Sequence, residues 1–378
     1  MNESSPRSVG AGAARSLKGE AMRIIIGGDV SVKDCYKQFA ECRGKELFYD
    51  VAELFGSADR VMINLECAVT EGNTPIKKIG PNLKAPLNTV KTLKNVGVTD
   101  VCLSNNHIFD FGRAGIADTV AQLEKHGIGY TGFGKNEHDS RKNMIITDGK
   151  TKVAIIAVCE HEYSYALENR MGARPYDPYD TNDDIAEAKK NADRVVVIYH
   201  GGKEGCRYPS PRLLKACRSM IKHGADIVLC QHSHCIGCYE EYGGGHILYG
   251  QGNFHFICKE YENIEDNGYM WNTGLLADIN IDGGLDFRLI PCTVDGLGVR
   301  LANESEKKQI LSELAERSLT LENGEWYSNW RRFALSQERY RIITDELYEE
   351  MAHLLDCEAH LDAMREVYKT LNYTNELD

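Results

Sequence analysis

From residue 22 onward, short apolar runs rich in Val and Ile alternate with stretches whose apolar positions recur at helical spacing. The short runs predict buried strands, and the helical spacing predicts amphipathic helices. The predicted strands are 23–28, 60–65, 100–104, 152–159, 194–199 and 226–230. The predicted helices between them are 46–56, 89–96, 114–126, 185–191 and 211–223. Such alternation is typical of an α/β domain.

The pattern changes after Cys230, where predicted strands follow one another without helices between them. These strands are 239–242, 246–249, 253–258, 274–281 and 285–291. Asp282-Gly-Gly284 predicts a hairpin turn between the last two, because glycine readily adopts a positive φ. We therefore expect a mixed α/β (α+β) fold in which helices flank two β-layers.

A further change at Asn303 predicts a helical extension. Charged segments with amphipathic periodicity predict helices at 305–321, 337–355 and 358–371. The expected organisation is a polar tail over residues 1–21, the α/β domain over 22–300 and the helical extension over 301–378.

The 378 residues carry a net charge of −12 at neutral pH. Because the chain has no Lys/Arg-rich block, this balance argues against nucleic-acid binding and against binding to anionic membranes. A small anionic or polymer-precursor substrate is compatible with it if a metal ion supplies positive charge. No segment predicts a transmembrane helix or a signal-peptide core, so we expect no membrane insertion and a cytoplasmic location. The oligomeric state has no signal in the sequence.

The thirteen cysteines are scattered through the predicted strands and helices. In a large chain without a predicted signal peptide, this distribution favours buried free thiols in a reducing compartment. Cys235 and Cys238 form one CxxC pair, but no second pair completes the pattern of a zinc site.

Polar residues follow the apolar runs at five predicted strand ends. Ligands of open α/β sheets bind beyond the carboxyl ends of the strands, so these positions are candidates for a binding site. Each residue alone has an ordinary explanation, because an Asp after a strand commonly caps a helix and a buried His is commonly held by hydrogen bonds. Convergence of all five strand ends at one sheet edge instead predicts a site. The residues are Asp29, Glu66, Asn106, His107, Asp110, His200, His232 and His234.

Imidazole and carboxylate ligands without thiolates suit divalent Mn, Fe or Zn, and one carboxylate can bridge two such ions. Two ions roughly 3.5–4 Å apart would clamp a phosphoryl group and activate water. His232 and His234 are separated by one residue, and a regular strand does not easily direct both rings at one ion. We expect either a loop at this point or one histidine on each of two ions.

The motifs resemble, in order, those of the calcineurin-like metallophosphoesterases and, more closely, those of the bacterial CapA family, also called capsule synthesis or poly-γ-glutamate biosynthesis proteins. The matching motifs are Gly28-Asp29, Asn64-Leu-Glu66, Asn105-Asn-His107 with Asp110-x-Gly112, His200-Gly201, His232-Ser-His234 and Tyr249-Gly-Gln-Gly-Asn-Phe254. The resemblance covers about residues 22–258. It implies a metallophosphoesterase-like four-layer αββα sandwich, and the C-terminal helical extension lies outside it.

The resemblance also implies roles for these residues. His107 would steady a phosphoryl oxygen or protonate the leaving group, and Asp110 would orient His107. Six residues would bind one or two divalent ions. The first ion would lie at Asp29 and His234, the second at Asn106, His200 and His232, and Glu66 would occupy the bridging position.

Three positions depart from the phosphoesterase pattern. Ser31 stands where those enzymes have the His of a D-x-H motif, so the first ion would lose a nitrogen ligand. Glu66 is one methylene longer than the usual bridging Asp, and Gly202 stands where an aromatic residue is usual. These departures fit CapA-like proteins.

Further residues near these motifs are candidates for substrate binding. Glu160 and His161 follow the fourth strand, with a surface turn as the alternative interpretation. Arg207 follows His200 on the next loop and is a candidate anion contact, with a solvated loop as the alternative. His255 lies between two Phe residues and is expected to pack at a strand edge.

The resemblance implies a metal-dependent hydrolase or transferase that acts on a phosphorylated or anionic acyl substrate, with capsule or poly-γ-glutamate biosynthesis as the pathway. The alternative is a non-catalytic accessory protein of a polymer biosynthetic complex, in which the ligand-type residues are structural. A carbohydrate-binding module would require clustered aromatic residues, and Trp271, Trp326 and Trp330 are scattered in the sequence.

Overall fold

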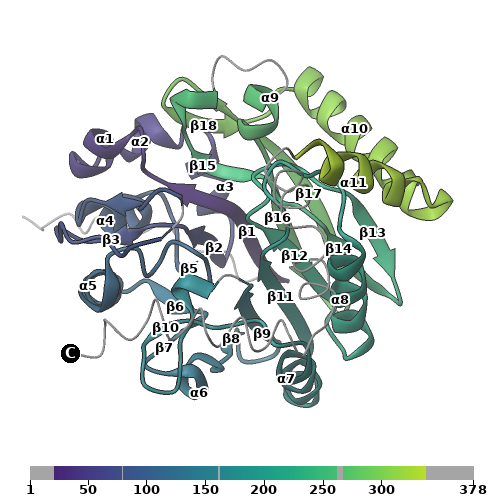
Figure 1. Ribbon diagram of the computed structural model, residues 1–378, viewed down its shortest axis with the longest axis horizontal. Helices are drawn as coiled ribbons and strands as arrows, with labels where there is room; N and C mark the ends of the chain where they lie inside the picture. The colour runs from purple at the N-terminus through teal and green to yellow at the C-terminus, as the bar shows by residue number, and fades with distance from the viewer. Residues whose placement is uncertain (1–20, 79, 161, 262–266, 338–378) are drawn as a thin grey trace, which may run out of the picture.

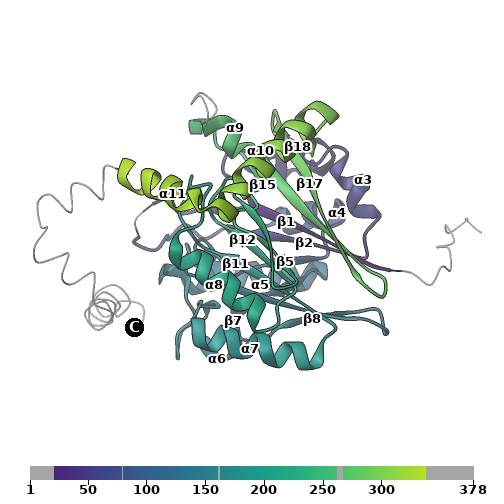
Figure 2. The same ribbon diagram turned by 90° about the vertical axis from the view of Figure 1, so that its right-hand side faces the viewer.

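The computed structural model describes residues 21–78, 80–160, 162–261 and 267–337. Two β-sheets face each other, and helices cover the outer face of each sheet (Figures 1 and 2). Figure 1 shows α4 and α5 on one side of the molecule and α7 and α8 on the other. The result is a four-layer αββα sandwich, which confirms the architecture that the resemblance implied.

The first sheet has the strand order β18-β17-β16-β1-β2-β5-β6, and β15 pairs with β1 outside this path. Strands β1, β2, β5 and β6 are parallel, whereas β16, β17 and β18 are antiparallel. The strands are β1 (Met22–Ser31), β2 (Arg60–Leu65), β5 (Asp100–Cys102), β6 (Gly129–Thr131), β15 (Asn253–Phe256), β16 (Thr273–Ile281), β17 (Leu285–Asp295) and β18 (Gly298–Leu301). The predicted hairpin between β16 and β17 is confirmed.

Strand β1 changes partner along its length. Its first half pairs with β16 in antiparallel register, and its second half pairs with β15 in parallel register. Gly28 lies at the change, where a Cβ would overlap the carbonyl oxygen of Gly252. The prediction that a strand ends at residue 28 was therefore wrong: β15 extends the ladder, and Asp29 lies inside β1 opposite Asn253.

The second sheet has the order β13-β14-β12-β11-β9-β8, with antiparallel strands at both edges. Its strands are β8 (Met144–Thr147), β9 (Lys152–Cys159), β11 (Arg194–His200), β12 (Ile227–Gln231), β13 (Tyr239–Tyr242) and β14 (Gly245–Leu248). Two short pairs lie apart from the main sheets: β3 (Ala68–Val69) with β4 (Lys84–Ala85), and β7 (Phe133–Gly134) with β10 (Gly172–Ala173).

The central strands are apolar on both faces because both faces are covered. Ile24 and Ile26 of β1 point into the core between the sheets, whereas Ile25 points toward the helices. In β11, Ile198 points inward and Tyr199 points outward. Burial of each such aliphatic side chain contributes roughly 1.5–3 kcal/mol, which explains why the two sheets remain in contact.

The helices of the first layer are α1 (Tyr36–Ala40), α2 (Gly44–Leu47), α3 (Val51–Gly56), α4 (Asn88–Asn95) and α5 (Gly112–His126). The helices beside or beyond the second sheet are α6 (Glu137–Ser140), α7 (Pro178–Asn191) and α8 (Pro211–Lys222), whereas α9 (Asn267–Trp271) lies against β16 of the first sheet. The single helix predicted over 46–56 was wrong, because α2 and α3 are separate. The prediction over 185–191 was too short, since Asp177 caps a helix that begins at Pro178.

The helical extension begins with α10 (Glu304–Asn323) and continues as α11 (Glu325–Ser336). Asn303 and Glu306 form a capping box at the start of α10, and Ile310 and Leu314 pack into the core between the sheets. The predicted helix 305–321 is confirmed, α11 was not predicted, and the segments 337–355 and 358–371 lie outside the described residues but for residue 337. No helix in the described ranges has the length and apolarity to cross a membrane.

Candidate metal centre

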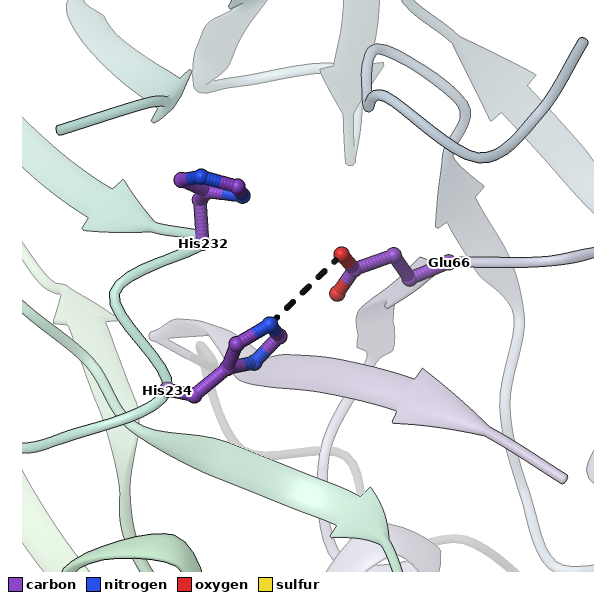
Figure 3. Close-up of side chains that lie close together, drawn as sticks. All are labelled: Glu66, His232 and His234. Carbon is purple, nitrogen blue, oxygen red and sulfur yellow. Dashed lines mark ion pairs between the residues drawn. The ribbon is translucent and has the colours of Figure 1, made fainter. Parts of the chain in front are cut away.

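The carboxyl ends of strands from both sheets meet at one place. Asp29 in β1 and Glu66 after β2 come from the first sheet, and His200, His232 and His234 come from the end of β11 and the loop after β12. All five side chains are buried. Their ligand atoms form two groups, each within 4.8 Å: Asp29, Glu66 and His200, and Glu66, His232 and His234. Glu66 belongs to both groups, and Figure 3 shows its carboxylate between the histidine loop and the first sheet.

The loop after β12 explains how two histidines one residue apart can face this centre. Strand β12 ends at Gln231, and His232 and His234 then adopt positive φ angles of 85° and 52°. These are left-handed conformations that residues other than glycine seldom adopt. The expectation of a loop is therefore met, and the two ring centroids lie 5.8 Å apart.

His234 is held by two residues that follow much later in the chain. Asn253 donates through its Nδ2 to the carbonyl oxygen of Trp271 at 3.0 Å, so its Oδ1 is free to accept from Nδ1 of His234 at 2.9 Å. The Trp271 ring lies 4.6 Å from the His234 ring. Nε2 of His234 then carries the lone pair and lies 4.0 Å from Oε1 of Glu66, as a metal ligand with an outer hydrogen bond would.

His200 is fixed between two asparagines. Nδ2 of Asn64 donates both to Oδ1 of Asp29 at 2.7 Å and toward Nδ1 of His200 at 3.1 Å. Nε2 of His200 lies 2.9 Å from Oδ1 of Asn106 and 3.6 Å from Oε1 of Glu66. The distances are compatible with Asn106 and His200 as ligands of one ion. The atom of His234 that lies 3.5 Å from Oδ2 of Asp29 is Nδ1, the nitrogen that bonds to Asn253, so the pairing of Asp29 and His234 at another ion stays a prediction.

Glu66 carries the strongest indication of a cation. Both carboxylate oxygens are buried, and neither accepts a hydrogen bond from the described residues. Burial and the nearby carboxylates of Asp29 and Glu204 raise the pKa of Glu66 well above its ordinary value, and burial also raises the pKa of Asp29. Buried like charges are costly unless a cation compensates them. The donor set of carboxylates and imidazoles therefore fits a divalent ion.

His107 and Asp110 form a second pair beside this centre. Nδ1 of His107 lies 2.6 Å from Oδ2 of Asp110, and Nε2 lies 4.0 Å from Oε1 of Glu66. Burial lowers the pKa of His107. The predicted contact between the two residues is present, whereas their catalytic roles stay predictions. Lys78 also contacts both side chains.

The remaining candidates lie elsewhere. The carboxylate of Glu160 bonds to Tyr199, Arg212 and the backbone of Gly202, outside both ligand groups. Arg207 lies 3.6 Å from Glu313 of α10. His161 lies outside the described residues. Ser31 is the last residue of β1 and is buried, and Oε1 of Glu204 lies 3.9 Å from Nε2 of His232. His255 packs in the core, 5.3 Å and 5.2 Å from the rings of Phe39 and Phe48.

Sequence reasoning missed four residues of the centre: Asn64, Lys78, Asn253 and Trp271. Asn64 and Asn253 each lie in a motif already noted, so their strand-end position was a usable signal. Lys78 lies in a loop and Trp271 at the end of a short helix, and nothing in the sequence near either residue indicates that it reaches the histidines.

The family model described as bacterial capsule synthesis protein PGA_cap matches residues 23–257, more than half of the chain. The chain belongs to this family. The PGA biosynthesis protein CapA of Bacillus subtilis is 32% identical over 240 residues, which cover 61% of this chain and 62% of that protein. The capsule biosynthesis protein CapA of Bacillus anthracis is 30% identical over 247 residues, covering 63% and 60%. The chain thus matches about three fifths of the length of these two relatives.

Two further proteins are more distant from this chain. A Mycobacterium tuberculosis protein described as a probable polyglutamine synthesis accessory protein is 28% identical over 221 residues, covering 55% of this chain and 57% of that protein. The crystal structure of a hypothetical protein from Thermus thermophilus superposes with a TM-score of 0.46 at 16% identity, covering 75% of this chain and all of that one.

Proposed function

We propose that the protein is a metal-dependent hydrolase or transferase that acts on a phosphorylated or anionic acyl substrate in capsule or poly-γ-glutamate biosynthesis. The observation that carries the proposal is the carboxylate of Glu66, which is buried, accepts no hydrogen bond from the described residues and lies within 4.0 Å of three histidines. The biosynthetic pathway in this proposal follows the names of the two Bacillus relatives.

Asp29, Glu66, His200, His232 and His234 would hold the ion or ions, together with Asn106. A bound divalent ion would act as a Lewis acid on a phosphoryl or acyl oxygen and lower the pKa of water. The protein itself supplies the orientation of the ligands and their burial, which strengthens electrostatic contacts by excluding water.

His107 is the residue we propose to handle a proton. Its Nε2 faces the same carboxylate oxygen of Glu66 that His200 and His234 face, so a substrate oxygen bound there lies next to it. Asp110 holds the opposite ring nitrogen and fixes the ring orientation. Once Nε2 has taken up a proton, His107 would stabilise the substrate oxygen or pass that proton to the leaving group.

Metal analysis of purified protein tests the site. We expect one or two transition-metal ions per chain, and loss of one ion when His200 and His232 are both changed to Ala. His223→Ala is the matched control, because His223 is exposed and its ring bonds, among the described residues, only to the backbone of its own helix. Unchanged metal content in the double variant, measured by mass spectrometry after digestion, would contradict the site.

Turnover of an aryl phosphate with added Mn or Zn tests the chemistry. His107→Ala should keep the bound ions and lower turnover about 10²-fold or more, the usual contribution of a proton-transferring residue. If His107→Ala loses metal as readily as His232→Ala, the division between ligand and proton-handling residues is wrong.

A non-catalytic accessory role is the second candidate. Ser31 supports it, since replacement of a histidine ligand at this position weakens the first ion site, and the name of the Mycobacterium tuberculosis relative points the same way. Bound metal without turnover of any phosphoester or acyl substrate would favour this role.

A further inference from the structure

Lys78 is a buried lysine beside the candidate centre. It lies in the segment between β3 and β4, and its side chain is 3% exposed. Its Nζ forms an ion pair with Oδ1 of Asp110 and lies 3.1 Å from Nδ1 of His107 and 3.4 Å from the carbonyl oxygen of Asn106. Burial lowers the pKa of Lys78, which expresses the cost of removing an ammonium group from water. A lysine at this depth therefore needs compensating contacts, and Asp110 supplies the charged one.

The contacts of Asp110 show what the lysine does there. Oδ2 accepts from the backbone N–H of Leu83 at 2.6 Å and lies 2.6 Å from Nδ1 of His107. Oδ1 is the oxygen that faces Lys78. Each oxygen thus has its own donors, and the carboxylate cannot rotate without breaking contacts on both sides.

The same contacts determine the tautomer of His107. The ammonium group of Lys78 donates hydrogen bonds and cannot accept one. Of the two groups next to Nδ1 of His107, Lys78 and Asp110, only Asp110 can therefore accept a hydrogen bond from a proton on this nitrogen. A separation of 2.6 Å between a ring nitrogen and a carboxylate oxygen requires such a proton. Nε2 therefore carries the lone pair of the neutral ring, and it is the nitrogen that faces Glu66.

We infer that Lys78 is a positioning residue of the centre: by binding Oδ1 of Asp110 it fixes the carboxylate so that Oδ2 holds Nδ1–H of His107 and directs Nε2 toward the metal-ligand group. The effect on turnover rests on the function proposed above, whereas the effect on His107 does not. The polar contacts of Lys78 with the described residues are to Asp110, His107 and the backbone of Asn106, so it acts through the Asp110–His107 pair.

Kinetics of Lys78→Met tests this role, because methionine keeps the length of the side chain and removes its charge. We expect kcat for an aryl phosphate to fall about ten- to hundredfold, as for other misplaced reacting groups, with KM and metal content unchanged. Lys77→Met is the matched control, since Lys77 is the exposed neighbour in the same loop. In a His107→Ala background, Lys78→Met should cause no further loss. An equal loss with and without His107 would overturn the inference.

A second measurement needs no turnover. In metal-free protein labelled with ¹⁵N-histidine, the hydrogen-bonded Nδ1–H of His107 should give a low-field proton signal, assigned by its loss in His107→Ala. This signal should weaken or disappear in Lys78→Met and persist in Lys77→Met. Lys78→Arg keeps the charge and should retain the signal. If Lys78→Met does not fold, Lys78→Arg is the variant to measure in its place.

The two measurements separate the possible failures. If the signal depends on Lys78 but the wild type turns over no substrate, the positioning role stands and the proposed function fails. If the signal and the turnover both survive Lys78→Met unchanged, the positioning role is overturned. The signal and the turnover could also both be lost in Lys78→Arg as well as in Lys78→Met, with the fold intact. That result would show that the shape of the side chain, and not its charge, matters at this position, and it would also overturn the positioning role.

Discussion

His232 and His234 combine an unfavourable backbone with a buried polar side chain. A left-handed conformation costs a residue other than glycine or asparagine about 1–2 kcal/mol, and this loop contains two such residues in close succession. Folding alone would favour Gly or Asn at both positions. The presence of histidine instead indicates that the imidazole groups are needed at this place, which fits a metal ligand better than a packing residue.

His232→Asn tests that interpretation. Asparagine tolerates the left-handed region, so we expect the metal-free variant to be at least as stable as the wild type, with a gain of up to about 1 kcal/mol in the free energy of unfolding. The same variant should bind less metal. Urea denaturation in the presence of a chelator measures the first effect and metal analysis the second. A loss of stability well above the size of this gain would instead identify His232 as a packing residue.

His255 provides a pH-dependent contribution to stability. Burial lowers its pKa from the ordinary 6.5 to about 4. Between these values the unfolded chain binds a proton and the folded protein does not, so stability is lost as the pH falls from about 6.5 to about 4. The shift corresponds to on the order of 3 kcal/mol. In His255→Gln, urea denaturation at several pH values should show a smaller loss over this interval. Parallel profiles for the two proteins would contradict the assignment.

At the scale of elements, the long strands could be predicted and the short elements could not. β2 and β9 were predicted with their observed bounds because both faces are buried and the apolar run is continuous. α1 and α6 have five and four residues, too few for a helical period to be visible. Strand β1 was predicted too short because its second half is stabilised by β15, a partner that no local pattern reveals.

The candidate site, like the elements, could be predicted only in part from the sequence. The ligand-type residues could be found because each lies next to the end of an apolar strand, where the sequence marks the sheet edge. Lys78 and Trp271 reach the site from other segments, and their contacts exist only after the chain has folded. The roles of the site residues stay predictions, because side-chain proximity alone does not test them.

Helix α10 offers a test of how far the C-terminal extension belongs to the fold. Leu314 is 6% exposed and packs between the sheets, whereas Leu319 in the same helix is 57% exposed. Leu314→Ala should lower the free energy of unfolding by about 2–5 kcal/mol, the usual range for a buried leucine. Leu319→Ala should change it by about 0.5 kcal/mol or less. Equal effects in thermal or urea denaturation would mean that α10 packs only loosely on the sandwich.

For the molecule as a whole, the centre joins the two sheets. Asp29 and Glu66 belong to one sheet and the three histidines to the other, so a bound ion connects both halves of the sandwich. An ion at a concentration of about 100 times its Kd adds about 2.7 kcal/mol to the free energy of unfolding. Adding Mn or Zn to chelator-treated protein should raise Tm and slow hydrogen exchange at the strand ends of both sheets together.

The variant lacking His200 and His232 is the control for this experiment. It should show a markedly smaller rise in Tm on addition of the same ion. Slower exchange confined to one sheet would indicate that the ion binds on that side alone, and would contradict a centre shared by the two sheets.

The change of partner along β1 has a consequence for how the protein is made. Asp29 pairs with Asn253, which is 224 residues later in the chain (253 minus 29). A ribosome adding roughly 5–20 residues per second needs on the order of ten seconds or more to reach that point. Until then the first strand of the nascent chain has no neighbour on this edge, and the histidines that complete the centre are absent or unsupported. The centre must therefore assemble late in synthesis or after release, and the exposed edge of β1 is where a nascent chain would most need a chaperone.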